Sequence, residues 1–413
     1  MINMKRILLL ISLLLIGCSK EELFFPNPAD IDIVEVESPQ PPPPFEIYGT
    51  SFEIHEYNNG YYSLHTTKLP DDPWLIVGIT YVDFNKDGYV DIVGKDEYNP
   101  SVLKLYTNQG DGTYEVSILP SENGFPFDEV GPRKVISADV NNDGELDIIV
   151  GLAPDDFENP RGLYIFENKG NGESFYGHTI ISGEHDWIHA VSAGDINNDG
   201  FIDIFMGGLN YVFLGNGDFT FTKKDLPNYI NNAVSCELVD INQDGLLDVL
   251  LGSHKPSYDP SAVWGKFGNS HSIHYGTGDD NLFSEEYVLQ SNYDGTNITL
   301  DFTVIDFDND GDLDLFANSN FDYGSKYVIQ YYENNGYMNF INKSYDVFEN
   351  ECNLVPNHND IDWIKFIDMD DDGIKELMVE AANWDKTGGE YLEPNFNGFQ
   401  LNENGKFIRK MFK

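Results

Sequence analysis

The chain has 413 residues and is strongly acidic, with 24 Lys and Arg against 70 Asp and Glu and a formal net charge of −46. This balance excludes a general electrostatic footprint for nucleic acid or for anionic lipid headgroups, because phosphate binding requires clustered Lys and Arg. Aromatic residues make up 14% of the chain, whereas disordered chains combine high charge with few aromatics. The sequence therefore predicts a folded protein whose acidic residues serve another purpose.

The N-terminus has the features of an export signal. Basic residues precede the apolar run 7–16, which is too short to span a membrane. The run ends in Leu15-Ile16-Gly17-Cys18, which resembles the bacterial lipobox, and this resemblance implies transfer of diacylglycerol to Cys18 and cleavage before it. We therefore expect residues 1–17 to be a lipoprotein signal peptide and the mature protein to be lipid-anchored in the bacterial outer membrane. Ser19-Lys20-Glu21-Glu22 resembles the Lys-acidic-acidic tag of Bacteroidota lipoproteins, which implies exposure at the cell surface. A plain secretory signal or an anchor helix is the alternative.

Residues 18–45 are expected to form a lipidated, proline-rich linker. This segment has no apolar periodicity and ends in a proline cluster at 39–44, which favours an extended and semi-rigid polyproline conformation. A partner-binding proline motif is the alternative to a spacer. The folded body is predicted over residues 46–413.

Six nine-residue segments carry oxygen-bearing side chains at positions 1, 3, 5 and 9 and Gly at position 6, counted from the first Asp of each segment. Loop by loop, these side chains are Asp83, Asn85, Asp87 and Asp91; Asp139, Asn141, Asp143 and Asp147; Asp195, Asn197, Asp199 and Asp203; Asp240, Asn242, Asp244 and Asp248; Asp306, Asp308, Asp310 and Asp314; and Asp368, Asp370, Asp372 and Glu376. Ca²⁺ takes six to eight oxygens, and the EF-hand loop supplies them from alternate positions with Gly at position 6. The pattern predicts up to six calcium ions, with the carbonyl of position 7 as a further ligand.

The repetition indicates a structural role for these ions. One such loop could be an ordinary turn rich in Asp, Asn and Gly. A catalytic metal would need an open coordination position beside a pocket, whereas equivalent closed sites repeated along the chain favour a scaffold.

Strands, and not helices, are predicted on both sides of the loops. Each loop is followed by a short apolar run, such as 148–151, and then by an aromatic-rich hairpin with a Gly/Asn turn, such as 105–114. A further hairpin at 54–62 precedes the first loop. Units of four strands are typical of propeller blades, in which each sheet covers its neighbours. The sequence therefore predicts an all-β chain forming a single β-propeller of about seven blades, six of which carry calcium loops.

The unit of loop, strand and hairpin resembles the FG-GAP or VCBS repeat, which integrin α-subunit propellers share with many bacterial surface proteins. The resemblance covers roughly residues 50–413 and implies that each calcium loop joins the first two strands of a blade, on the face away from the usual ligand. Two departures stand at the ends: the first unit has no loop, and Glu376 replaces Asp in the last loop. The motif is specific for the fold and not for an activity.

If this blade order holds, the opposite face is formed by the remaining connections. The candidate ligand-binding residues on these segments are Arg133, Arg161, His185, Trp187, Trp264 and Trp384. A Trp plane offers stacking area and Arg offers a fork for carboxylate or sulfate, a combination that suits a sugar-binding surface. Trp264 is the foremost candidate because it lies in the longest connection, 254–272. For Trp74, Trp187 and Trp363, wedging between blades is the favoured alternative.

The sequence thus favours a monomeric, surface-displayed binding or adhesion lipoprotein whose ligand is a glycan or a protein. The alternative is a calcium-dependent carbohydrate-active enzyme resembling polysaccharide lyases, in which the loop with His185, Asp186, Trp187 and His189 would supply a base and the two arginines a carboxylate clamp. A fold alone does not establish an activity, and a His in such a loop is more often a surface hydrogen-bonding residue. The sequence contains no nucleophile elbow, zinc signature or phosphate loop.

Overall fold

The structure is a computed structural model that describes most of the chain from residue 79 onwards. The described residues are 79–89, 91–95, 102–110, 113–125, 132–152, 161–184, 190–207, 211–226, 233–253, 271–284, 286–292, 297–321, 326–336, 339–356, 359–367, 375–383 and 398–410. All of them belong to one compact unit, Ile47–Lys413. The predicted signal peptide, the linker and the hairpin at 54–62 lie outside the described residues.

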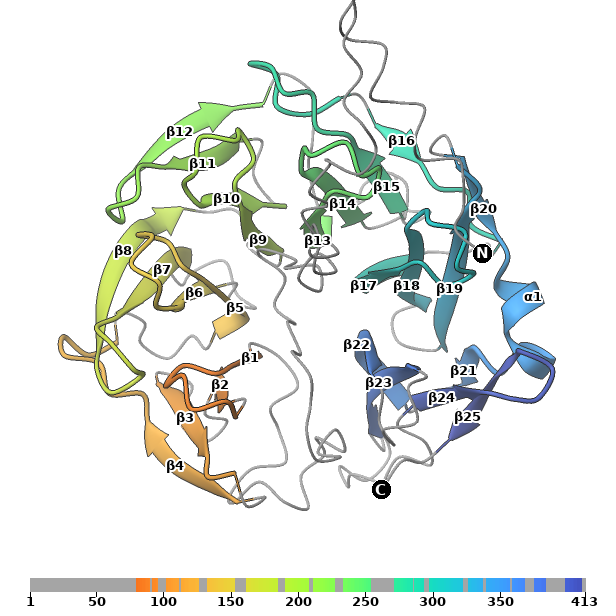
Figure 1. Ribbon diagram of the computed structural model, residues 1–413, viewed down its shortest axis with the longest axis horizontal. Helices are drawn as coiled ribbons and strands as arrows, with labels where there is room; N and C mark the ends of the chain where they lie inside the picture. The colour runs from red at the N-terminus through yellow and green to blue at the C-terminus, as the bar shows by residue number, and fades with distance from the viewer. Residues whose placement is uncertain are drawn as a thin grey trace, which may run out of the picture. The chain divides into compact units, whose positions relative to one another are not determined.

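The first three blades are antiparallel sheets of four strands each, in the order of the sequence (Figure 1). Their strands are β1 (Ile79–Val82), β2 (Asp91–Lys95), β3 (Leu103–Asn108) and β4 (Tyr114–Ile118); β5 (Pro132–Ala138), β6 (Asp147–Leu152), β7 (Arg161–Asn168) and β8 (Phe175–Glu184); and β9 (Val191–Gly194), β10 (Asp203–Met206), β11 (Tyr211–Gly215) and β12 (Phe221–Asp225).

The next three blades follow the same plan, and the fifth carries an additional short strand. Their strands are β13 (Ala233–Val239), β14 (Asp248–Ser253), β15 (His271–His274) and β16 (Tyr287–Val288); β17 (Asn297–Ile305), β18 (Asp314–Phe321), β19 (Lys326–Asn334), β20 (Phe340–Asn342) and β21 (Leu354–Pro356); and β22 (Asn359–Ile367), β23 (Glu376–Asn383), β24 (Gly398–Leu401) and β25 (Phe407–Lys410).

The six sheets form the blades of a β-propeller, as the sequence predicts. The first strand of each blade lies beside the first strand of the next, from β1 through β5, β9, β13 and β17 to β22. The described residues form six blades, and each of them begins with the strand that precedes one of the six predicted loops. The sequence predicts about seven blades because of a further hairpin at 54–62, which lies outside the described residues.

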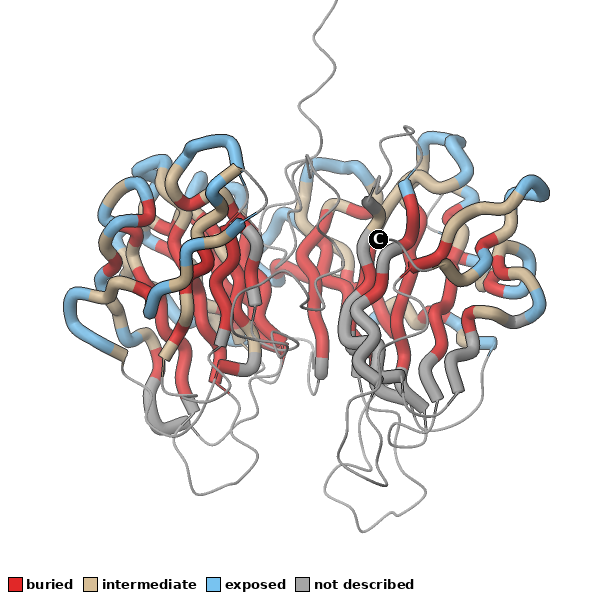
Figure 2. Tube along the Cα trace, turned by 90° about the horizontal axis from the view of Figure 1, so that it is seen from below, coloured by how far each residue is buried: buried red, intermediate tan, exposed pale blue. Residues whose placement is uncertain are grey.

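The hydrophobic core of this propeller lies between consecutive blades. The second strand of the second blade shows how the period of a strand produces this: Ile148 and Val150 pack in a cluster with the first blade, whereas Ile149 between them packs with the third. Because side chains alternate between the faces of a sheet, a short, wholly apolar strand is buried on both sides. Figure 2 shows this burial along the strands and the exposure of their loops.

An insertion fastens the fifth blade to the sixth. The outer edge of β19 pairs first with β20 and then with β21, and between these strands the chain forms α1 (Ser344–Val347) and a short 3-10 helix at Glu349–Glu351. Phe348 packs edge-to-face against Phe399 and in a tilted arrangement against Phe407, both in the sixth blade. The Nε of Arg409 donates to the carbonyl of Cys352 at 2.8 Å. No helix within the described residues is long and apolar enough to cross a membrane.

Candidate metal sites and ligand face

The predicted calcium loops connect the first and second strands of the blades. Five of them are described almost completely, at 83–91, 139–147, 195–203, 240–248 and 306–314. In the sixth loop, residues 368–374 lie outside the described residues. Only its end is described, where Glu376 is buried at the start of β23.

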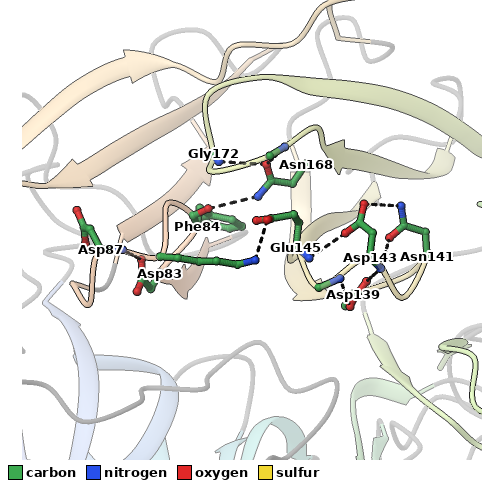
Figure 3. A network of polar contacts seen from close by, with 12 residues as sticks. Asp83, Phe84, Asp87, Asp139, Asn141, Asp143, Glu145, Asn168 and Gly172 are labelled. Atoms are coloured by element: carbon green, nitrogen blue, oxygen red, sulfur yellow. Dashed lines mark hydrogen bonds and ion pairs between the residues drawn. The ribbon is translucent and has the colours of Figure 1, made fainter.

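The second loop shows how the polar side chains are organised (Figure 3). The N–H groups of Asp143 and Gly144 donate to the two carboxylate oxygens of Asp139, at 3.0 and 2.8 Å. The amide of Asn141 accepts from the N–H of Asp143 at 3.1 Å and donates to Asp143 Oδ2 at 2.8 Å. Asp143 Oδ1 accepts the N–H of Glu145 at 2.8 Å. The side chains at positions 1, 3 and 5 are therefore drawn together by the turn itself.

Two of these bonds recur in all five described loops. The N–H of position 6 donates to the position-1 carboxylate in each described loop, at 2.8 to 3.2 Å. The N–H of position 7 donates to the position-5 carboxylate in each, at 2.8 to 3.0 Å. The backbone explains the recurring glycine: Gly144 has a φ of 86° and an added Cβ would meet nothing within 4 Å, so the conformation and not the available space requires Gly.

The acids at position 9 are buried and fasten each loop to the hairpin of its own blade. Asp147, for example, accepts the N–H of Val140 at 2.9 Å through one oxygen and the N–H of Asn168 at 2.9 Å through the other. The corresponding residues are Asp91, Asp203, Asp248 and Asp314. Burial raises the pKa of these carboxyls to about 7 for Asp91, Asp203 and Asp248, about 8 for Asp147 and about 6 for Asp314. A cation in the loop would oppose this effect, because a nearby opposite charge favours the ionised form.

The fifth loop provides a test of whether these residues fit a cation. The carboxylates of Asp306, Asp308 and Asp310 offer oxygens that all lie within 4.8 Å of one another. Asp306 Oδ1 is buried and accepts no hydrogen bond within the described part of the chain. A buried carboxylate oxygen without a donor is costly unless a cation lies beside it. The three oxygen donors fit a hard cation such as Ca²⁺.

Asp314 is not a member of that group. It accepts hydrogen bonds from the N–H groups of Phe307 and Asn334 and from the hydroxyl of Tyr331. Metal coordination by position 9 therefore stays a prediction, and the hydrogen bonds made by position 9 are a role that the sequence analysis does not assign.

The aromatic side chains at position 7 of the first and third loops pack over glycines of the hairpin turns. Tyr89 and Phe201 are 41% and 37% exposed, and each covers a glycine in the hairpin of its own blade, Gly110 or Gly217. A Cβ on either glycine would lie 2.5 Å from the aromatic ring. The glycines of the hairpin turns are the sequence signal for this contact, since a close approach is one reason for a backbone site to lack a side chain.

Two of the candidate ligand residues, Arg133 and Arg161, lie in described strands at the end of the sheet away from the loop. Because the strands run antiparallel in sequence order, the loops and the hairpins share one end of each sheet, and the remaining connections share the other. Arg133 is the second residue of β5 and Arg161 is the first of β7, and β6 lies between these strands. Both arginines thus lie at the same end of one sheet, on the strand that enters the calcium loop and on the strand that follows β6. Trp363 lies within β22, whereas His185, Trp187, Trp264 and Trp384 lie outside the described residues.

Comparisons with known proteins point to one repeat family. Residues 83–150 and 139–206 match the FG-GAP-like repeat. A search of curated proteins found no match. Among solved structures, the biofilm matrix protein Bap1 of V. cholerae is similar to 64% of this chain at 16% identity, with a TM-score of 0.34. The aligned part is 39% of the length of Bap1, and a likeness at this level carries nothing about ligand or activity. The matched repeats and the six described blades together support an FG-GAP-repeat β-propeller.

Proposed function

We propose that the chain is a calcium-stabilised binding or adhesion protein, displayed on the bacterial surface by a lipid anchor. The observation that carries the proposal is the recurrence of one polar arrangement in five loops, in which positions 1, 3 and 5 converge. Equivalent sites repeated in successive blades suit a scaffold better than a single reaction centre, which needs one open coordination position and a pocket.

Calcium would neutralise the converging carboxylates and so favour the folded loops. Positions 1, 3 and 5 would hold the ion, assisted by the carbonyl of position 7. The position-9 acids would hold the loop to the hairpin through their backbone hydrogen bonds. A rigid loop end would fix the register of the strands that present the opposite end of the blades.

We place the ligand surface at the end of the blades away from the loops. The support is the placement of Arg133 and Arg161 at this end of a single sheet, in a chain whose overall charge otherwise repels anions. A pair of guanidinium groups suits the carboxylate or sulfate of an acidic glycan or of an acidic protein segment. Trp264, Trp187, His185 and Trp384 remain candidates on the basis of the sequence.

The binding role is tested on a glycan array with the wild-type protein and two variants. Arg133→Lys with Arg161→Lys should weaken an acidic ligand at least as much as Trp264→Ala does, because Lys cannot form two parallel bonds to a carboxylate. The melting temperature should stay near that of the wild type. If the Lys variant binds normally and Trp264→Ala alone abolishes binding, the ligand is neutral and held by stacking. If all variants bind normally, the ligand surface lies elsewhere.

The enzyme alternative is separated by incubating the pure protein with a panel of acidic polysaccharides. Retention of a polysaccharide without a product supports binding. New ultraviolet absorbance from unsaturated uronate ends would identify a lyase and overturn the binding proposal.

The anchor is tested by Cys18→Ala. We expect this variant to accumulate as uncleaved precursor and to lose labelling by a palmitate analogue in the cell. Normal processing and labelling would contradict the lipoprotein assignment.

A further inference from the structure

In the first four described loops, the side chain at position 4 contacts the next loop along the chain. The residues at this position are Lys86, Asn142, Asn198, Gln243 and Asn309, and all have a left-handed backbone with φ between 57° and 61°. This conformation is uncommon for residues other than Gly, and Asn tolerates it best. The repeated backbone geometry therefore gives the position-4 side chains one common direction.

Three of these side chains donate to the same atom of the next loop, the carbonyl oxygen of the glycine at position 6. Asn142 Nδ2 lies 2.8 Å from the carbonyl oxygen of Gly200. Asn198 Nδ2 lies 3.3 Å from that of Gly245, and Gln243 Nε2 lies 3.0 Å from that of Gly311. The partners are 47 to 68 residues apart in the sequence, so the contacts depend on the packing of neighbouring blades.

The first link uses an ion pair in place of the amide. Lys86 Nζ lies 2.7 Å from Glu145 Oε1, at position 7 of the second loop. The loops from the first to the fifth blade are thus joined in chain order by four contacts, each running from position 4 of one loop to the turn at positions 6 and 7 of the next.

The glycine carbonyl that receives the link belongs to the peptide group that orients a candidate ligand. In the third loop, the carbonyl of Gly200 accepts from Asn142, while the N–H on the other side of the same peptide bond, that of Phe201, donates to Asp199 Oδ1 at 3.0 Å. A peptide bond is planar, so fixing its carbonyl also fixes the direction of its N–H. Hydrogen bonds arranged in such a chain also polarise one another.

The fourth and fifth loops repeat this relay. The N–H of Leu246 donates to Asp244 Oδ1 at 2.9 Å, and the N–H of Asp312 donates to Asp310 Oδ1 at 2.9 Å. In each case the position-4 side chain of one loop thereby acts on the position-5 carboxylate of the next.

We propose that the position-4 side chains are positioning residues that couple consecutive metal loops, so that ordering of one loop by calcium raises the calcium affinity of the next. This inference rests on the proposed binding of calcium. A loop that has been ordered by an ion holds its position-4 side chain in place, and the neighbouring loop then loses less conformational entropy when it binds its own ion.

Asn142→Gly and Asn198→Gly break single links without straining the backbone, because Gly adopts a positive φ freely. Asn171→Gly is the matched control, since Asn171 has a φ of 54° in an exposed hairpin turn and is not part of the relay. The first readout is amide hydrogen exchange in calcium-containing buffer, which does not require that the metal binds. Loss of a hydrogen bond of ordinary strength should accelerate exchange of the affected amide about fivefold.

The two variants should act on different loops. Asn142→Gly should accelerate exchange at Phe201 and leave Leu246 unchanged, whereas Asn198→Gly should accelerate exchange at Leu246 and leave Phe201 unchanged. The Asn171→Gly control should change neither amide. Exchange equal to wild type at Phe201 in the first variant and at Leu246 in the second would overturn the proposed links.

The second readout is calorimetric titration with Ca²⁺. The wild type should bind with a Hill coefficient above one. The triple variant Asn142→Gly, Asn198→Gly and Gln243→Gly should bind the same number of ions with a smaller coefficient, because only the link between Lys86 and Glu145 remains. An equal Hill coefficient in both proteins would overturn the coupling while leaving calcium binding intact. A wild-type protein that binds no calcium would instead contradict the proposed function.

Discussion

The boundary between the second and third blades differs from that between the fourth and fifth, although the loops above them are built alike. The first boundary is apolar, with Ile149, Ile165 and Ile204 fully buried in one cluster. At the second, the imidazole of His271 is also fully buried but lies within a hydrogen-bond network. The comparison teaches that the repeated loop restrains the turn, whereas the packing between sheets can vary from blade to blade.

The buried network is centred on His271 and Gln330. His271 Nδ1 lies 2.8 Å from the hydroxyl oxygen of Thr299, and Nε2 lies 2.8 Å from Gln330 Nε2. Since an amide nitrogen can only donate, Nε2 accepts, and the proton of the neutral ring is on Nδ1 and donates to Thr299. The side-chain oxygen of Gln330, Oε1, accepts from the hydroxyl of Ser291, at 2.8 Å, and from the hydroxyl of Tyr332, at 3.1 Å. Burial lowers the pKa of His271 to about 3.

The largest effect is expected from a cavity at the apolar boundary. Ile204→Ala truncates a fully buried side chain in the cluster shared by the second and third blades, and should lower the free energy of unfolding by about 2 to 5 kcal/mol. Denaturant unfolding measures this change. Ile118→Ala on the outer strand β4, where Ile118 is 57% exposed, serves as the control and should cost far less. Equal losses would contradict the assignment of the core to the blade boundaries.

The next effect is a pH dependence that arises from His271, at the boundary between the fourth and fifth blades. His271 has a folded-state pKa of about 3, below the ordinary value of 6.5, so the unfolded chain binds one more proton between these values. The stability contributed by the neutral ring is present above pH 6.5 and is lost as the pH falls towards 3. Between pH 7 and pH 4 the loss attributable to His271 should be roughly 3 kcal/mol.

His271→Gln keeps hydrogen-bonding capacity without a titrating group. Its stability should therefore fall less between pH 7 and pH 4 than that of the wild type, as measured by denaturant unfolding at each pH. The same pH dependence in both proteins would show that His271 is not buried as a neutral ring.

The smallest losses of stability are expected from two substitutions, one that replaces a hydroxyl by a methyl group at the boundary with His271 and one that does the reverse at the apolar boundary. Thr299→Val leaves the N–H of His271 without its acceptor, and Val191→Thr places a hydroxyl in the apolar cluster. Both changes should cost about 1 to 3 kcal/mol, because each leaves a buried polar group without a hydrogen bond. If Thr299→Val is neutral or stabilising in thermal melts, the network does not hold the boundary and the contrast between the two boundaries fails.

The repetitive part of the molecule could be predicted from the sequence because its causes are local. In the second blade, the acids at alternate positions and Gly144 at position 6 predict the turn, and the apolar run 148–151 predicts the buried strand that follows it. The hairpins are also predictable, because their turns are marked by Gly and Asn in the local sequence. The pairing of β3 with β4 confirms the predicted hairpin at 105–114.

The remaining features depend on contacts between residues that are far apart in the chain. The His271 network joins residues 28 to 59 positions apart, and no local pattern distinguishes a buried His from an exposed one. The links from position 4 leave a weak signal, since Lys86, Asn142, Asn198 and Gln243 can all donate hydrogen bonds. The insertion that holds the fifth blade to the sixth could not be predicted from the sequence, where it is only a connecting segment. Its aromatic contacts join residues of different blades, and no local pattern indicates them.

The most direct test of the central claim is the melting temperature of the wild type in calcium and in chelator, measured together with the number of calcium ions bound per chain. Metal that binds only the folded state adds RT ln(1 + [L]/Kd) of stability for each site, so several loops should give a large upward shift. Asp199→Ala, which removes a predicted ligand, should reduce both the shift and the number of ions, whereas Asp225→Ala, an exposed acid of the same blade, should change neither. Identical melting curves in calcium and in chelator, with no calcium bound, would contradict the account.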